Sequence, residues 1–218
     1  MTVKELIQEF RAVDKKNMVV SDPEHIFALR ILDKFMAGHK GFIAGGCFKN
    51  LFSHEYIKDI DVFFENEIDH QGAVKAFDNS CEDGEYTKYY ESKNVNAYKH
   101  KSGIVVELVK SVFGTPEEVL NMFDFTITKF AYYKEVDATG DVTYKAMYND
   151  NFFEHLHLKR VVIDKNIPKP MSTFDRVLRY VKYGYTPCTE TKQKLINALS
   201  MLPESDILVK KNFYNGID

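Results

Sequence analysis

The chain has 218 residues, enough for one substantial domain or for one domain with a helical appendage. Its formal net charge of −3 gives no overall attraction for nucleic acid, although a local basic surface is compatible with it. Three widely spaced cysteines form no C-x-x-C pair, which argues against a disulfide framework or a structural zinc site. No apolar run reaches membrane-spanning length, and the first residues lack a signal pattern, so we expect a cytoplasmic protein with no membrane partner.

Helices and strands are predicted to interleave along most of the chain. A helix is expected over residues 3–15, and another begins at the capping pattern of residues 21–24 and stops near Gly38. A short apolar strand over 41–44 then leads into Gly45-Gly46. The elements expected after this turn are a helix over 48–52, a strand over 59–64, a helix over 69–77, strands over 86–90, 95–98 and 103–109, a helix over 114–122, strands over 125–133 and 142–148, and a short helix over 151–158.

The pattern changes after residues 167–170, which contain two prolines. From residue 172 to the end the chain is predicted to be wholly helical, with breaks at 184–187 and near Pro203. We therefore predict an α+β fold, with a mixed central sheet flanked by helices over residues 1–166 and a small helical part over residues 167–218.

The strongest functional signal is Gly45-Gly46 followed, after a short helix, by Asp59-Ile60-Asp61. Alternate residues of a strand share a face, so Asp59 and Asp61 project together while Ile60 points to the opposite face. Adjacent carboxylates resist desolvation unless a cation lies between them, and Mg²⁺ or Mn²⁺ suits such oxygen ligands. The Gly-Gly corner lets backbone N–H groups approach an anion. Phosphate beside a metal ion outlines a nucleotide site.

Glu107 is the one charged residue in the strand predicted over 103–109. If this strand lies beside the Asp59-Ile60-Asp61 strand, three carboxylates could hold two divalent ions and support in-line displacement at phosphorus. An Asp-x-Asp pair alone is also common on edge strands and at loop ends, where it has no catalytic role. The ordered combination of turn, helix, paired acids and a later strand with one Glu favours the site.

In this order the motifs resemble those of the polymerase-β-type nucleotidyltransferase superfamily, in which a Gly-Gly or Gly-Ser turn precedes Asp-x-Asp or Asp-x-Glu on a strand. Within it, the chain is most similar to the head of tRNA nucleotidyltransferases (CCA-adding enzymes) and bacterial poly(A) polymerases. Residues 45–52 resemble the first motif of these enzymes. Residues 123–130 resemble their Arg-Arg-Asp-Phe-Thr-Ile-Asn-Ala-Leu motif, and residues 176–185 resemble their arginine-bearing neck helix.

The resemblance implies a metal-dependent nucleotidyltransferase that moves NMP from an NTP such as ATP to an acceptor hydroxyl and releases pyrophosphate. Asp59, Asp61 and Glu107 would be the catalytic residues and the ligands of Mg²⁺ or Mn²⁺. The implied nucleotide-binding residues are Gly45, Gly46, Cys47, Lys49, Asp124, Arg176 and Arg179. For Asp124 the alternative is a turn hydrogen bond at the start of a strand, and for the two arginines it is a solvated helix face.

The chain also departs from the family motifs. Lys49-Asn50 replaces Arg-Asp, Phe123 replaces an arginine, and Thr128-Lys129 replaces Asn-Ala. The part after Tyr185 is too short for the domains with which the resembling enzymes grip tRNA. The acceptor therefore stays open between an RNA 3′ end such as that of tRNA, a protein side chain and a small molecule, with the motifs favouring RNA. Two other functions stay open, namely a nucleotide-binding regulatory protein without turnover and a tRNA-modifying toxin or anti-host factor.

Overall fold

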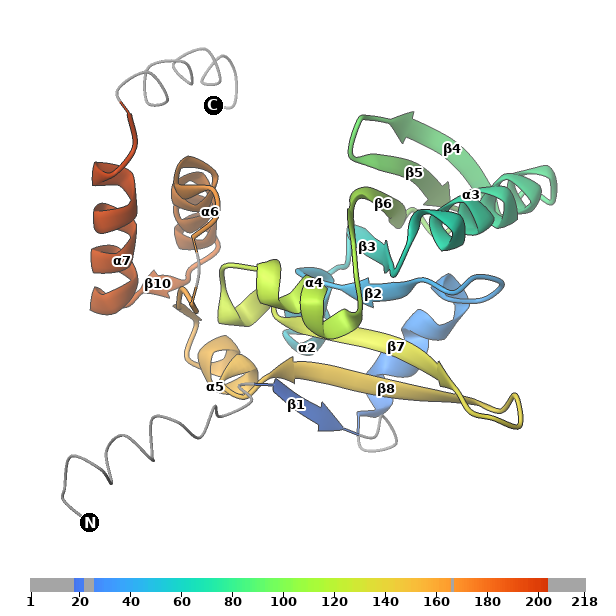
Figure 1. Ribbon diagram of the computed structural model, residues 1–218, viewed down its shortest axis with the longest axis horizontal. Coiled ribbons are helices and arrows are strands. Elements are labelled where there is room, and N and C mark those ends of the chain that lie inside the picture. The colour runs from blue at the N-terminus through green and yellow to red at the C-terminus, as the bar shows by residue number, and fades with distance from the viewer. Residues whose placement is uncertain (1–17, 22–25, 166, 204–218) are drawn as a thin grey trace.

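The computed structural model describes residues 18–21, 26–165 and 167–203. These residues form a mixed eight-stranded sheet with helices packed on both faces, and a pair of helices lies at one end (Figure 1). The predicted α+β fold is confirmed. The helix expected over residues 3–15 and the capping residues 22–24 lie outside the described residues.

The sheet contains eight strands that come from most of the described chain. They are β1 (Met18–Ser21), β2 (Phe42–Ala44), β3 (Asp59–Phe64), β4 (Tyr86–Glu91), β5 (Val95–His100), β6 (Val105–Phe113), β7 (Phe130–Val136) and β8 (Val142–Asn149). Their spatial order is β1-β8-β7-β2-β3-β6-β5-β4. All the neighbouring pairs in this sheet are antiparallel except β3 and β6, which are parallel.

Helices connect and cover these strands. They are the 3₁₀-helices η2 (Phe27–Phe35) and η3 (Thr126–Thr128) and the α-helices α2 (Cys47–Phe52), α3 (Glu67–Glu82), α4 (Pro116–Met122), α5 (Phe152–His157), α6 (Pro170–Lys182) and α7 (Thr189–Ser200). Several begin at clear sequence signals, such as the capping box between Thr115 and Glu118 at the start of α4. Among the described residues, no helix combines the length and apolarity needed to cross a bilayer.

One local prediction was wrong, and three short strands were not predicted. The strand expected over 125–133 begins only at Phe130, because residues 126–128 turn as η3 and the Thr128 hydroxyl donates to the Phe125 carbonyl instead of leaving it to a strand partner. The C-terminal part forms the helices α6 and α7 as predicted, and the predicted break over 184–187 contains the short strand β10 (Thr186–Pro187), which pairs with β9 (Arg160–Val161); neither strand was predicted. The edge strand β1 was not predicted.

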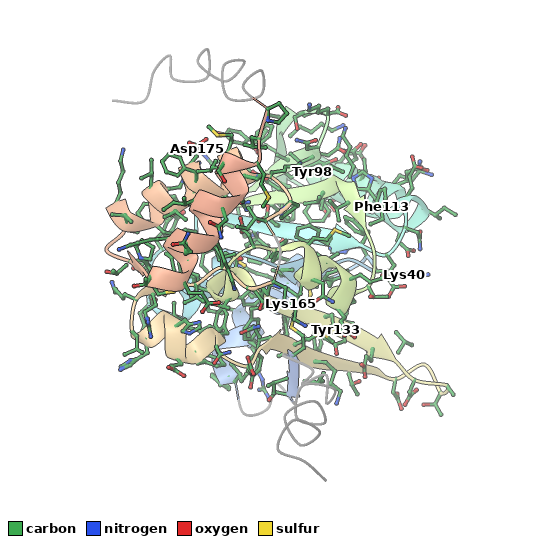
Figure 2. The ribbon with its side chains drawn as sticks, turned by 60° about the vertical axis from the view of Figure 1, so that its left-hand side comes forward. Lys40, Tyr98, Phe113, Tyr133, Lys165 and Asp175 are labelled. Atoms are coloured by element: carbon green, nitrogen blue, oxygen red, sulfur yellow. The ribbon has the colours of Figure 1, made fainter. Side chains whose placement is uncertain are left out.

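The core consists of two clusters, one on each face of the sheet. The larger one takes Ile60 and Val62 from β3, whereas the smaller one takes Phe63 from β3 and also includes residues of α4. Figure 2 labels one residue of each cluster, Tyr98 of the larger and Tyr133 of the smaller. By alternation along β3, the predicted carboxylates lie on the face of the smaller cluster.

Candidate functional site

The parallel pairing of β3 with β6 brings the three predicted carboxylates together. Asp61 lies directly opposite Glu107, and Asp59 lies two residues before it, opposite Val105. The intervening residues Ile60 and Val106 are fully buried on the other face. Asp59, Asp61 and Glu107 therefore share one face, on strands that are far apart in the sequence.

The crowding of these acids changes their protonation. The pKa of Asp61 is raised from 3.8 to about 7, first by burial and then by the negative charges of Glu107 and Asp59, with a hydrogen bond to Glu107 adding to the effect. The same charges reach Cys47, whose thiol pKa is raised well above its ordinary value, mainly by burial and further by Asp61 and Asp59. The site is thus strongly electronegative, and a bound cation would relieve that repulsion.

Tyr90 joins this cluster from the edge strand β4. Its hydroxyl donates a hydrogen bond to the Glu107 carboxylate. Tyr90 lies opposite Ala97 on β5, and Ala97 lies opposite Glu107 on β6. The alanine between them is short, so the phenol reaches across it to the carboxylate. Burial, followed by the bond to Glu107, raises the pKa of Tyr90. Sequence reasoning missed this residue because the contact depends on the register of three strands.

The two glycines of the turn differ in backbone conformation and in the space around them. Gly45 has φ +106°, a conformation that favours glycine, and its N–H donates to the Phe130 carbonyl over 3.0 Å. A Cβ at this position would lie 3.5 Å from Oδ2 of Asp61 and 3.7 Å from the Phe123 ring. Gly46 caps α2 with φ −69°, and a Cβ there would meet nothing within 4 Å. Open space therefore faces the second glycine, and the turn sits directly beside Asp61.

Asp124 and Arg176, two predicted nucleotide-binding residues, form an ion pair. Asp124 is 1% exposed, and its Oδ2 accepts hydrogen bonds from the Thr173 hydroxyl at 2.8 Å and from the Arg176 guanidinium at 2.6 Å. Its Oδ1 has no hydrogen-bond partner among the described residues. Asp124 and Arg176 are thus paired with each other, in place of a turn hydrogen bond and a solvated helix face, and the pair holds α6 against Asp124.

The two remaining cationic residues of the prediction, Lys49 and Arg179, differ in whether their side chains are free to bind a ligand. Lys49 is buried, and its amine donates to Asn50 and, over 3.4 Å, to Glu55. The same amine lies 5.6 Å from the ring centre of Tyr183 and 5.9 Å from that of Tyr185. Arg179 is exposed and makes no ion pair within the described ranges. Arg179 is therefore the freer of the two to meet a ligand phosphate.

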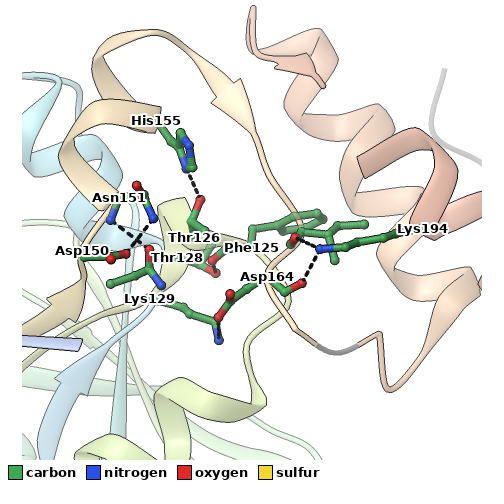
Figure 3. A network of polar contacts seen from close by, with 11 residues as sticks. Phe125, Thr126, Thr128, Lys129, Asp150, Asn151, His155, Asp164 and Lys194 are labelled. Carbon is green, nitrogen blue, oxygen red and sulfur yellow. Dashed lines mark hydrogen bonds and ion pairs between the residues drawn. The ribbon is translucent and has the colours of Figure 1, made fainter. Parts of the chain in front are cut away.

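The segment after Asp124 is fixed to the C-terminal elements by a polar network (Figure 3). Thr126 Oγ1 and His155 Nδ1 are hydrogen bonded at 2.8 Å. Lys129 is 2% exposed and forms an ion pair with Asp164 at 2.6 Å, and Lys194 of α7 donates to the Asp164 carbonyl at 3.0 Å. The Lys129 amine thus serves the packing of this segment and points to no open space.

The three carboxylates match a divalent cation in chemistry, although they are not yet arranged around one. In the part of the chain that the structure describes, no group of three or more His, Cys, Asp or Glu side chains is placed to hold a metal ion. All three predicted ligands supply carboxylate oxygens, the donors that Mg²⁺ prefers. Burial and the neighbouring negative charges together raise the pKa of Asp61, and a bound cation would offset both effects. The donor set therefore fits, with the hydrogen bond between Asp61 and Glu107 to be exchanged for contacts with the ion.

Solved structures of CCA-adding enzymes share this fold. The enzyme from Thermotoga maritima, complexed with tRNA, matches with a TM-score of 0.57 and 17% identity over 84% of this chain and 46% of that chain. A CCA-adding enzyme in complex with CTP matches with 0.56 and 17% over 84% and 45%, and an apo form with 0.54 and 17% over 83% and 43%. The fold is that of the nucleotidyltransferase region of these enzymes, and the chain spans less than half of their length.

Comparison at the level of sequence gives a different kind of match. No curated protein matches the chain. A family model described as Gabija anti-defense 2 family protein matches residues 16–159. The matched range contains the glycine turn, the three carboxylates, Tyr90 and Asp124.

Proposed function

The chain belongs to the Gabija anti-defense 2 family, and from this premise and the carboxylate geometry we propose that it is a metal-dependent nucleotidyltransferase. It transfers NMP from an NTP to an acceptor hydroxyl and releases pyrophosphate. The observation that carries the proposal is the β3–β6 pairing, which sets Asp61 opposite Glu107 with Asp59 on the same face and the Gly45 turn alongside. By the name of its family, the transfer serves to counter the defence called Gabija.

Three carboxylates form the reacting centre in this proposal. Asp59 and Asp61 would hold the divalent ions, with Glu107 as the third ligand on the side of the acceptor, where it also takes the proton of the acceptor hydroxyl. When bound, Mg²⁺ or Mn²⁺ neutralises charge on the transferring phosphoryl group and on the leaving pyrophosphate. No covalent enzyme intermediate is needed.

The nucleotide-binding residues surround that centre. The backbone of Gly45, Gly46 and Cys47 meets the triphosphate, with the open space over Gly46 admitting it. Arg179, exposed on α6, supplies a cation for the phosphates. Asp124, which Arg176 holds in place, would accept a ribose hydroxyl through its unpartnered Oδ1 once the side chains that cover this buried oxygen move aside. Lys49 could reach a phosphate only by leaving Glu55 and Asn50.

The test uses each labelled NTP with Mg²⁺ or Mn²⁺ and a pool of acceptors, total RNA first and then cell extract. RNA comes first because one of the structures of like fold, the CCA-adding enzyme of Thermotoga maritima, is a complex with tRNA. Label on an acceptor, lost in Asp59→Asn/Asp61→Asn, supports the proposal. Absence of any metal-dependent nucleotide binding would overturn it. Glu107→Gln is the test of the third ligand, since unchanged transfer would remove Glu107 from the reacting centre.

A nucleotide-binding regulator without turnover is the second candidate. Two observations favour it. Glu107 is hydrogen bonded to Asp61 and Tyr90. Among the described residues, no group of three or more His, Cys, Asp or Glu side chains is placed to hold a metal ion. The two candidates separate in the same assay. A regulator binds an NTP and labels nothing, whereas the transferase labels an acceptor.

A further inference from the structure

A β-bulge in β4 turns Tyr90 onto the face of the carboxylates. Tyr86 belongs to the larger core cluster, and strict alternation along β4 would place Tyr90 on that same face. The pairing with β5 shifts register between Lys88, which faces Tyr98, and Tyr90, which faces Ala97. The extra residue, Tyr89, reverses the alternation, as bulges do where a side chain is re-aimed. Tyr90 therefore lies on the side of Glu107 and Asp61.

The contact that results places a phenolic hydroxyl beside the carboxylate to which the proposed function assigns the acceptor's proton. Tyr90 donates its phenolic hydrogen to Glu107, the carboxylate that faces the acceptor in the proposed reaction. Tyr90 is 43% exposed, so a nucleotide attached to it would not have to fit into a closed core. We propose that Tyr90 is an acceptor for the chain's own transfer reaction and becomes modified with NMP on its phenolic oxygen. This inference rests on the proposed function and names one acceptor for it.

The reaction balances with an NTP as the only co-reactant. Tyr90 Oη forms a bond to the α-phosphorus, and the bond from that phosphorus to the oxygen bridging to the β-phosphorus breaks. Pyrophosphate leaves with the electron pair of that bond. The phenolic proton passes to Glu107, with which it is already shared in a hydrogen bond. The product is a phosphodiester between Tyr90 and the nucleoside.

Tyr89 provides a matched control. It is 57% exposed, its ring centre lies 5.4 Å from that of Tyr90, and its ring lies 5.8 Å from the Lys99 amine. Its hydroxyl makes no hydrogen bond in the described part of the chain. The two residues thus have the same side chain, lie on the same strand and are both exposed. They differ in that only Tyr90 is hydrogen bonded to Glu107.

The experiment incubates the purified full chain with each NTP and Mg²⁺ or Mn²⁺, without other acceptors, and then measures intact mass and maps the modified peptide. We expect a mass gain of one NMP that maps to Tyr90. The gain should persist in Tyr89→Phe and be lost in Tyr90→Phe and in Asp59→Asn/Asp61→Asn. Peptide mapping of the wild type locates the label without relying on any variant.

The outcomes separate this inference from the proposed function. Label on RNA or extract proteins with none on the chain overturns the Tyr90 inference and leaves the transferase standing. Label on the chain at any other residue also overturns it. Absence of transfer to every acceptor overturns both.

A second experiment tests the position of Tyr90 relative to the bound nucleotide without requiring the transfer reaction. An NTP analogue with a methylene group between the α- and β-phosphorus atoms cannot release pyrophosphate. With this analogue and Mg²⁺ bound, we expect nitration of Tyr90 to fall several-fold, because its hydroxyl then lies against the α-phosphate, while nitration of Tyr89 stays unchanged. Equal nitration of Tyr90 with and without the analogue would contradict the placement.

A third experiment tests whether the transfer is within one chain. Asp61→Asn keeps Tyr90 but lacks a reacting carboxylate, and Tyr90→Phe keeps the carboxylates but lacks the acceptor. When the two variants are mixed with NTP, we expect no label on the Asp61→Asn chain. Label on that chain would show transfer between copies and overturn the intramolecular reaction.

Discussion

Arg176 donates a hydrogen bond to Oδ2 of Asp124 over 2.6 Å, and Thr173, one turn earlier on α6, donates to the same oxygen. One oxygen of this carboxylate thus accepts both hydrogen bonds from α6, while the other oxygen has no partner among the described residues. Arg176 is therefore engaged in holding the structure together, and Arg179, three residues further on, is not. The two arginines should respond differently to substitution.

Arg176→Ala is expected to lower the free energy of unfolding by about 2–4 kcal/mol, because it leaves the charge of Asp124 buried with only Thr173. Arg179→Ala removes an exposed side chain and should change it by less than about 0.5 kcal/mol, while weakening NTP binding. Urea denaturation and nucleotide titration of both variants measure the two effects. Equal destabilisation by the two substitutions would contradict the assignment.

Asp61→Asn is expected to stabilise the metal-free chain near neutral pH while abolishing transfer. The folded-state pKa of Asp61 is about 7 against 3.8 ordinarily, so between these values the folded chain keeps a proton that the unfolded chain has lost. Its contribution to stability is full below the ordinary pKa and is lost as pH rises through the folded value. The substitution should therefore gain about 1–3 kcal/mol at about pH 8 and little at about pH 4. Denaturation across that pH range is the measurement, and a pH-independent loss would contradict it.

Mg²⁺ or Mn²⁺ is expected to raise the thermal stability of the wild type without nucleotide. An ion that binds only the folded chain adds about 2.7 kcal/mol at a hundred times its Kd. The gain should shrink as pH falls below about 7, because protons compete for Asp61. Thermal unfolding with added metal, then with chelator, measures the shift. An equal shift in Asp59→Asn/Asp61→Asn would place the ion elsewhere.

The two turn glycines offer a paired test of phosphate approach. Gly45→Ala forces a side chain into a positive-φ conformation and should cost about 1–2 kcal/mol of stability. Gly46→Ala meets no neighbour and should leave stability almost unchanged, yet reduce NTP affinity roughly tenfold, because the new methyl group occupies the space for the triphosphate. Calorimetric titration with an NTP gives the affinity. Unchanged affinity in Gly46→Ala would remove the turn from the nucleotide site.

Lys129→Met is expected to destabilise the chain by about 3–5 kcal/mol, because it leaves the largely buried charge of Asp164 without its ion-pair partner. Adding Asp164→Asn to the same chain should recover part of the loss, since the uncompensated charge is then gone. Denaturation of the single and double variants gives the coupling. Additive losses would mean that the two side chains act independently.

The sequence alone was sufficient for the local elements of the site. Alternation predicted that Asp59 and Asp61 share a face opposite Ile60, and a single charge in an apolar strand singled out Glu107. That β3 and β6 are neighbours came from resemblance, because no local pattern states which strands pair. The whole of the proposed catalytic role remains a prediction.

The features that were not predicted depend on strand register and on contacts between residues far apart in the sequence. Tyr90 reaches Glu107 only because a bulge reverses one alternation, and a bulge at Tyr89 has no glycine or proline to signal it. Asp124 and Arg176 are individually visible in the sequence, but 52 residues separate them. The strand Met18–Ser21 is too short to show a period, and its place at the sheet edge is set by β8.

The β3–β6 pairing has a consequence for the dynamics of the sheet. It is the one parallel strand pair of the described eight-stranded sheet, and strands β6, β5 and β4 are connected to the other five strands through it. Three carboxylates lie on one face of this pair, and their mutual repulsion lowers the free energy needed to separate the two strands locally. Backbone amides of β3 should then exchange with solvent sooner than those of β7, and a cation bound by the carboxylates should slow that exchange.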